Sequence, residues 1–340
     1  MIKHVTDPQP TLFEPPVIEA NNPRTKSAYN QDLADLLDFL RQRHAQFAEP
    51  PFDHDLVAKW IDEKRARGSQ YSTIRRRLSS LTALYKQKRL GDLRKDPAID
   101  AAWQRVVTQL RRREDKPLAV TEAGVRLMVR KMDDVYGELA LPDPRTTRSY
   151  LRDRAIILLE HHGALTRGEV ASLLVANIIR ATDGGGLRLK VNPSGLMEDT
   201  DGSLVWVSPD RTRPVKIPRA DNPGFCAVMA LHRWFVASDV QDGFVFRGIR
   251  ATGHLTKSIS ATVIADMHKF RCAGVEDLAG DTISPHSLRR GVVATMSGEG
   301  HQLPAIQERT GLKTLDSVAD MIAVGHQLGT DVRKKAVIAV

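Results

Sequence analysis

Residues 283–296 read ISPHSLRRGVVATM, and the interpretation of the whole chain starts from this stretch. Ser284 and Pro285 are typical of a helix start, because serine caps the first turn and proline already has a helical φ angle. Val292 and Met296 follow at the spacing of one apolar helix face. The stretch therefore predicts an amphipathic helix that Ser284 caps.

A histidine and an arginine lie three residues apart near the start of this helix. At that spacing His286 and Arg289 share one helix face, where an imidazole and a guanidinium can together hold the oxygens of one phosphate. An isolated H-x-x-R is more often part of an ordinary polar surface. The phosphate-binding interpretation therefore depends on the rest of the chain.

The composition favours an anionic partner. The 340 residues include 50 Lys+Arg against 41 Asp+Glu, which gives a formal net charge of +9. The length suits two domains or one large one, and the 41% of hydrophobic residues are enough to bury a core. Cys226 and Cys272 are far apart and form no C-x-x-C pair, so we expect neither disulfides nor a zinc site but a reducing cytoplasm. His161 and His162 have no ligand partners at metal-binding spacing, so no metal or cofactor is expected. Signal-peptide and membrane-spanning patterns are also missing, and no membrane partner is expected.

Proline positions and helical periodicity divide the chain into segments. Residues 1–23 carry five prolines and predict a flexible N-terminal arm. Amphipathic segments within residues 24–113 predict a helical bundle, and residues 114–120 predict a polar linker in which Pro117 ends helix. A second domain over residues 121–328 and a C-terminal tail over residues 329–340 complete the predicted organisation.

The second domain is expected to be mainly helical. A nearly continuous apolar run at residues 153–161 predicts a buried central helix. Residues 187–191, 203–207 and 214–218 alternate as short strands, which predicts a small antiparallel sheet. Glycines 184–186 indicate a turn and not a phosphate loop, because no G-K-[ST] ending follows. The predicted fold class is therefore mainly α with a small antiparallel β-sheet, in two domains.

Positive charge is concentrated in the predicted bundle. Residues 59–113 hold 16 Lys+Arg and five Asp+Glu, an excess of +11 against +9 for the whole chain. Such charge can simply be solvated, but its concentration in one small bundle favours binding to a polyanion. Aromatic residues are few and not interleaved, which favours a duplex backbone over a stacked single strand. The DNA-binding candidates here are Arg75, Arg76, Arg77, Lys86, Arg111, Arg112 and Arg113.

The order of these signals resembles the tyrosine recombinase or phage integrase family. The resemblance covers roughly residues 25–330 and includes the basic bundle, the segment TRGE at 166–169, the H-x-x-R and a final helix about thirty residues later. It implies a two-domain clamp around double-stranded DNA. In the family a tyrosine attacks a phosphodiester, while two arginines, a lysine and one or two histidines or a tryptophan stabilise the phosphate and move protons.

The resemblance carries these roles only in part onto this sequence. His286 and Arg289 match the H-x-x-R, and Glu169 matches the acidic residue of R-x-x-E. Thr166 stands where the first catalytic arginine is expected, with Arg167 one residue on, and Leu312 stands where a second histidine or tryptophan is expected. The family's catalytic lysine, which is expected in a hairpin of the sheet, has no secure counterpart in this sequence. Arg213, Lys216 or Lys190 are its candidates, and Arg167, Arg213 and Arg290 join the DNA-binding set.

The family's nucleophile is missing at its expected position. Met321 stands there, on an apolar stripe where it is adequately explained as core, and a thioether cannot form the phosphotyrosine-like ester. None of the five tyrosines follows Tyr150. His326 or Ser317 as a substitute nucleophile lacks a neighbouring base at helical spacing.

Three functions remain open at this point. The first is a sequence-specific double-stranded DNA-binding protein without cleavage activity, serving replication, regulation or recombination as an accessory. The second is a site-specific recombinase whose nucleophile is mutated or unconventional, and the third is a non-specific DNA-packing protein. A nucleoid location in a bacterium, plasmid or phage system fits all three. We also expect the apolar residues 336–340 of the tail to dock on another copy on DNA.

Overall fold

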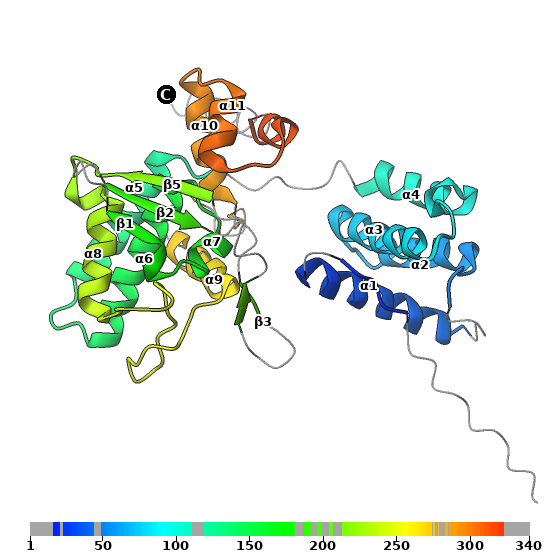
Figure 1. Cartoon of the computed structure of the whole chain (residues 1–340), viewed down its shortest axis with the longest axis horizontal. Helices are drawn as coiled ribbons and strands as arrows, with labels where there is room; N and C mark the ends of the chain where they lie inside the picture. Colours follow the sequence, from blue (N-terminus) through cyan, green and yellow to red (C-terminus); the bar gives the residue numbers. More distant parts are fainter. Residues whose placement is uncertain are drawn as a thin grey trace, which may run out of the picture. The chain divides into compact units, whose positions relative to one another are not determined.

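The computed structural model describes residues 16–20, 23–43, 49–110, 119–180, 186–191, 196–198, 204–206, 213–273, 275, 278, 283–284 and 286–322. Most of the predicted N-terminal arm, the arginines at 111–113, most of the linker, Pro285 and the tail at 329–340 lie outside these residues. The chain divides into two compact units, Met1–Glu114 and Asp115–Val340, each described here by itself (Figure 1).

The first unit is a helical bundle. Each of its helices turns an apolar face into one core, in which the side chains of Leu36, Trp60 and Leu81 are fully buried. Helix α2 begins after Asp53, whose carboxylate accepts a hydrogen bond from the Leu56 amide and so caps the first turn. The helices are α1 (Pro23–Arg41), α2 (His54–Ala66), α3 (Tyr71–Lys88) and α4 (Pro97–Leu110), with a 3-10 turn at Leu93–Lys95.

The second unit is also mainly helical. Its central helix α6 (Pro144–Gly163) is buried along almost all of its second half, as the apolar run at 153–161 predicts. Residues 315–322 form a further helix near the end of the described chain. The remaining helices are α5 (Glu122–Gly137), α7 (Arg167–Ala171), α8 (Ala227–Ser238), α9 (Ala261–Cys272), α10 (Ser287–Gly298) and α11 (Leu303–Thr310), with 3-10 turns at Val175–Asn177 and Pro223–Phe225.

A three-stranded antiparallel sheet packs on this helical core. Strand β2 (Gly186–Val191) lies between β1 (Ile178–Arg180) and β5 (Arg213–Pro218), with Leu189 opposite both Ile178 and Val215. Strands β3 (Leu196–Glu198) and β4 (Leu204–Trp206) pair separately as a hairpin. Alternate residues of β2 and β5 are buried and exposed, so one face of the sheet joins the core and the other meets solvent.

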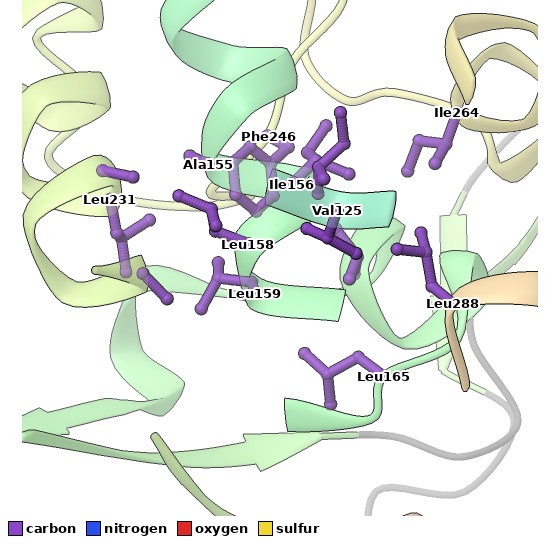
Figure 2. Packing of buried hydrophobic residues seen from close by; sticks show 14 of the residues in the cluster. Val125, Ala155, Ile156, Leu158, Leu159, Leu165, Leu231, Phe246, Ile264 and Leu288 are labelled. Atoms are coloured by element: carbon purple, nitrogen blue, oxygen red, sulfur yellow. The ribbon is translucent and has the colours of Figure 1, made fainter. Parts of the chain in front are cut away.

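The main core of the second unit surrounds α6. Figure 2 shows Ala155, Ile156, Leu158 and Leu159 of α6 lying among side chains of other helices and loops. Their partners include Val125, Leu165, Leu231, Phe246, Ile264 and Leu288, so segments distant in the sequence meet around one helix. Because α10 supplies Leu288 to this core, the position of the neighbouring Arg289 is fixed by packing.

The predicted fold class is confirmed, with differences in the strands. The sequence pattern predicted both ends of β2, β4 and β5 to within one residue, but it did not predict β1 or β3. The structure also separates β3 and β4 from the main sheet instead of forming one sheet. Among the described residues, no helix has both the length and the apolar character needed to cross a bilayer.

Candidate nucleic-acid interface

The helix that carries the H-x-x-R begins later than the sequence predicts. Its first residue is Ser287, and His286 occupies the N-cap position without a capping side-chain bond. The Ser284 hydroxyl accepts a hydrogen bond from the His286 amide at 3.2 Å, and the Ser284 amide donates to the Ser287 hydroxyl at 2.9 Å. These local bonds hold the two serines in a turn before the helix. The exposed His286 side chain therefore stands at the helix end and not on its lateral face.

Arg289 is buried and held in one orientation. Its Nε donates to the Ala164 carbonyl at 2.8 Å, and its Nη2 donates to Glu169 Oε2 at 3.1 Å. Desolvation lowers the pKa of Arg289, while the charge of Glu169 acts in the opposite direction. The guanidinium is thus fixed by two bonds, with 9% of its side chain still exposed.

Thr166 and Glu169 form a reciprocal cap at the start of α7. The Glu169 amide donates to Thr166 Oγ1 at 3.2 Å, and the Thr166 amide donates to Glu169 Oε2 at 2.7 Å. This capping box satisfies two backbone donors that a helix start leaves open. Thr166, which stands where the resemblance leads one to expect the first catalytic arginine, is therefore a helix cap that orients the Glu169 carboxylate.

A second arginine reaches the same carboxylate from the sheet. Arg213, the first residue of β5, donates from Nη2 to Glu169 Oε1 at 3.0 Å and from Nη1 to the Arg309 carbonyl at 3.3 Å. Gly311 makes room for it, since a Cβ at this position would lie 2.9 Å from Arg213 Cζ. Arg213 lies on the inner side of β5 with Val215 and Ile217, whereas Lys216 lies on the outer side. This period-2 pattern could have shown from the sequence that Arg213, and not Lys216, points toward the core.

The remaining candidates on the sheet and around His286 are less buried. Lys190 and Lys216 are exposed on the outer face of the sheet, away from Glu169. Arg167 and Arg290 are partly buried. Desolvation, followed by the charges of Arg289, Arg290 and Arg167, lowers the pKa of His286, so the imidazole is mainly neutral at pH 7.

Sequence reasoning missed Arg309. Its Nη1 donates to the Lys216 carbonyl at 3.0 Å, and its Nη2 donates to the His162 carbonyl. Its own carbonyl accepts from Arg213. Arg309 therefore ties α11 to β5 and α6 and fixes one side of the Arg213 guanidinium, a tertiary role for which the sequence around it carries no motif.

Leu312 and Met321 belong to a small apolar cluster. Both pack against the buried Val293, Ile306 and Val318, which come from α10, α11 and the helix at 315–322. Their side chains are partly buried. The interpretation of Met321 as a packing residue is therefore sufficient to explain its position.

Tyr150, which packs against the core of the second unit, is already engaged in other contacts. Tyr150 donates its hydroxyl to Asp133 Oδ1 at 2.7 Å and stacks on Tyr136 with ring centroids 4.1 Å apart. Burial, together with the hydrogen bond to Asp133, raises the pKa of Tyr150 to about 12. This phenol is held as a structural group.

The arginines at 75–77 have different surroundings. Arg75 is exposed on α3, as is Lys86 further along the same helix. Arg76 donates to Asp32 at 2.6 Å, and Arg77 lies 3.7 Å from the same carboxylate. Desolvation raises the pKa of Asp32 despite these two charges. Arg76 and Arg77 are therefore engaged by the carboxylate of the buried Asp32, whereas Arg75 and Lys86 are exposed on α3.

Metal binding finds no support in the part of the chain that the structure describes. Within it, no three histidine, cysteine, aspartate or glutamate side chains gather closely enough to hold a metal ion. Cys226 and Cys272 are both buried in the second unit as free thiols. The candidate site is thus built from guanidinium, imidazole and carboxylate groups.

The chain thus combines two compact units, a small antiparallel sheet and an H-x-x-R whose arginine bonds to Glu169. Residues 17–89 match the family model of the phage integrase N-terminal SAM-like domain. An integrase/recombinase XerD homolog of Selenomonas ruminantium is 23% identical over 307 residues, which cover 89% of this chain and 82% of the relative. The chain therefore resembles tyrosine recombinases and integrases along nearly its whole length.

Solved structures show the same fold. The Tn1549 transposon integrase, in complex with transposon right end DNA, aligns with a TM-score of 0.59 at 15% identity and covers 87% of this chain and 88% of its own. The XerH site-specific recombinase, bound to a palindromic difH substrate, aligns with a TM-score of 0.58 at 11% identity, covering 90% and 78%. At these identities the likeness concerns the fold.

Proposed function

We propose that this chain is a sequence-specific double-stranded DNA-binding protein that has the tyrosine recombinase fold and does not cleave DNA. The observation that carries the proposal is a contrast within the second unit. Arg289 and Arg213 are assembled around Glu169 as a phosphate site would require, whereas Leu312 and Met321 pack as apolar residues in one cluster. Under this proposal the two arginines hold a DNA phosphate, while the tyrosine that would attack phosphorus is absent from position 321.

The proposal includes a place and a mode of action. A protein of this kind acts on the chromosome, a plasmid or a phage genome, in replication, regulation or as an accessory of an active recombinase. Several copies assemble on one DNA site, with residues 329–340 docking on a neighbouring copy. The net charge of +9 favours the association of each copy with DNA.

One observation favours an enzyme as the second candidate. The similarity to an integrase/recombinase extends over 89% of this chain and is not confined to the N-terminal domain. Under this alternative, an unconventional nucleophile performs the cleavage. The non-cleaving protein and the enzyme can be told apart by one product, a covalent protein–DNA adduct, because only the enzyme forms a covalent bond to DNA.

Selection of bound fragments from sheared genomic DNA tests the proposal. At roughly physiological salt, where binding through phosphates alone is weakened, we expect a discrete repeated or palindromic site to be enriched. The selected DNA is then incubated with the protein, denatured and separated on a gel, and no covalent adduct is expected. A cleaving recombinase on its own site is the positive control. Adducts would establish the enzyme, and featureless binding would indicate a packing protein.

Arg75 and Arg76 are adjacent and provide a matched pair of variants. Arg75→Ala is expected to reduce the slope of log K against log salt by about one while leaving stability unchanged, because it removes one phosphate contact. Arg76→Ala is expected to destabilise the first unit by about 1–3 kcal/mol, because it removes a partner of the buried Asp32. Binding titrations at several salt concentrations and urea unfolding measure the two effects. If log K falls with log salt equally steeply for Arg75→Ala and for the wild type, Arg75 does not contact a DNA phosphate.

A further inference from the structure

We propose that Arg213 and Arg289 bind the same DNA phosphate, so that strand β5 supplies the second guanidinium that position 166 lacks. This inference rests on the proposed function, since it names the groups that hold the phosphate in the DNA complex. It assigns to Arg213 a direct contact with the ligand. The Glu169 carboxylate, between the two guanidiniums, orients both.

The first support is the geometry around one carboxylate. Arg289 donates to Glu169 Oε2 at 3.1 Å, and Arg213 donates to Glu169 Oε1 at 3.0 Å. Because both oxygens belong to a single carboxylate, the two guanidiniums are brought together by a group that is itself 2% exposed. Two guanidiniums in one place offer parallel N–H donors to the non-bridging oxygens of a phosphate.

The second support is the charge balance of the site. Arg289 interacts electrostatically with the carboxylates of Glu169 and Glu160 and with the guanidinium of Arg213, and Arg213 interacts in the same way with Arg309. Glu160 Oε2 already lies 2.7 Å from Nε2 of the buried His268. The charge of Arg213 lowers the pKa of both Arg289 and Arg309, after desolvation as the larger cause. An anion at this point would offset the mutual repulsion of the cations.

The third support is that Arg213 is held in place with donor capacity unused. Each of its two terminal nitrogens makes one hydrogen bond, Nη2 to Glu169 and Nη1 to the Arg309 carbonyl, and carries a second N–H that can donate to a ligand. The bonds to Glu169 and to the Arg309 carbonyl fix the side chain, which remains 15% exposed. A guanidinium that is already ordered loses little conformational entropy when a phosphate binds.

Position 166 explains why the second guanidinium comes from elsewhere. Thr166 is the N-cap of α7, and its amide and hydroxyl both bond to Glu169 Oε2. Arg167 follows the cap as the first residue of α7, and among the described hydrogen bonds none joins it to Glu169. Among the described residues, the basic side chains that form ion pairs with the Glu169 carboxylate are those of Arg213 and Arg289.

The competing role for Arg213 is purely structural. In that case its bond to the Arg309 carbonyl closes the end of α11, and its charge only balances Glu169. A structural arginine would affect stability and would leave the number of phosphates neutralised in the complex unchanged. The salt dependence of DNA binding separates the two roles.

The test uses the full-length chain and the duplex selected above. Arg213→Ala and Arg289→Ala are each expected to weaken binding by about tenfold or more and to lower the salt slope by about one. Arg213→Lys keeps the charge and loses the planar fork, so the slope should persist while affinity falls by a smaller factor. Unfolding curves identify any variant that does not fold, and Arg213→Gln, which also removes the charge but leaves less empty space, then replaces Arg213→Ala.

Duplexes with a single methylphosphonate, which removes one phosphate charge, locate the contact. A methylphosphonate at one position in the site is expected to weaken wild-type binding and to have little further effect on the uncharged Arg213 and Arg289 variants. If it weakens the uncharged Arg213 variant as much as it weakens the wild type, Arg213 does not contact this phosphate and the inference is overturned. If the wild type selects no DNA, the proposed function fails first, so the two failures are distinct.

Discussion

The Gly291→Ala variant is expected to lose about 3 kcal/mol or more of the free energy of unfolding of the second unit. A Cβ at this position would overlap the Val120 carbonyl and lie 3.0 Å from the Thr121 amide nitrogen, and both groups are backbone. The Val120 amide also donates to the Ser287 carbonyl at 2.9 Å, so α10 is held against this segment. The helix can accept the methyl group only by moving away, which would also displace Arg289 and weaken DNA binding.

Gly298→Ala is the matched control for this variant. Gly298 ends the same helix, and a Cβ there meets no atom within 4 Å. Because alanine has the higher helix propensity, this change is expected to stabilise the unit by about 0.5–1 kcal/mol. Urea unfolding, followed through hydrogen exchange of the α6 amides, reports on the second unit. Equal stability of the two variants would mean that α10 does not lie so close to Val120.

The second large effect is expected for Glu169→Gln. The substitution keeps the size of a side chain that is 2% exposed, but it leaves the guanidiniums of Arg213 and Arg289 without their shared counter-charge. Breaking a buried ion pair by removing one partner costs about 3–5 kcal/mol. The amide nitrogen of glutamine would also face N–H donors. We therefore expect a lower urea midpoint for the second unit.

An exposed glutamate provides the control for this substitution. Glu122 pairs with Arg126 one turn later on α5, and the two side chains are 48% and 47% exposed. Glu122→Gln should change stability by less than about 1 kcal/mol, because solvent screens exposed pairs. If Glu169→Gln unfolded at the same urea concentration as Glu122→Gln, Glu169 would not be the group that holds the two arginines together.

Long periodic segments made most of the fold predictable. The helices of the first unit and the buried α6 follow from apolar residues at helical spacing, which report burial directly. Strands β1 and β3 have three residues each, too few for a period-2 pattern to be read. The pairing of β3 with β4, outside the main sheet, depends on contacts between strands and has no local signal.

The candidate site was predictable as a set of residue types and not as an arrangement. His286, Arg289 and Glu169 could be named from motifs, but the bond between Arg289 and Glu169 joins residues 120 positions apart. The same limit applies to Arg76, whose partner Asp32 lies 44 positions away. The late start of α10 depends on serine hydroxyl bonds that compete with helical ones, and sequence reasoning placed the cap too early.

The capping box at Thr166 has a consequence for the evolution of this chain under the proposed function. Introducing arginine at position 166 would remove the hydroxyl that caps α7, at a cost of about 0.5–2 kcal/mol. The new guanidinium would also enter a site where Arg213 already bonds to Glu169. Thr166→Arg would therefore destabilise the second unit before any gain in catalysis, and Met321→Tyr would bring no benefit alone. Under the proposed function, cleavage activity would require several substitutions at once.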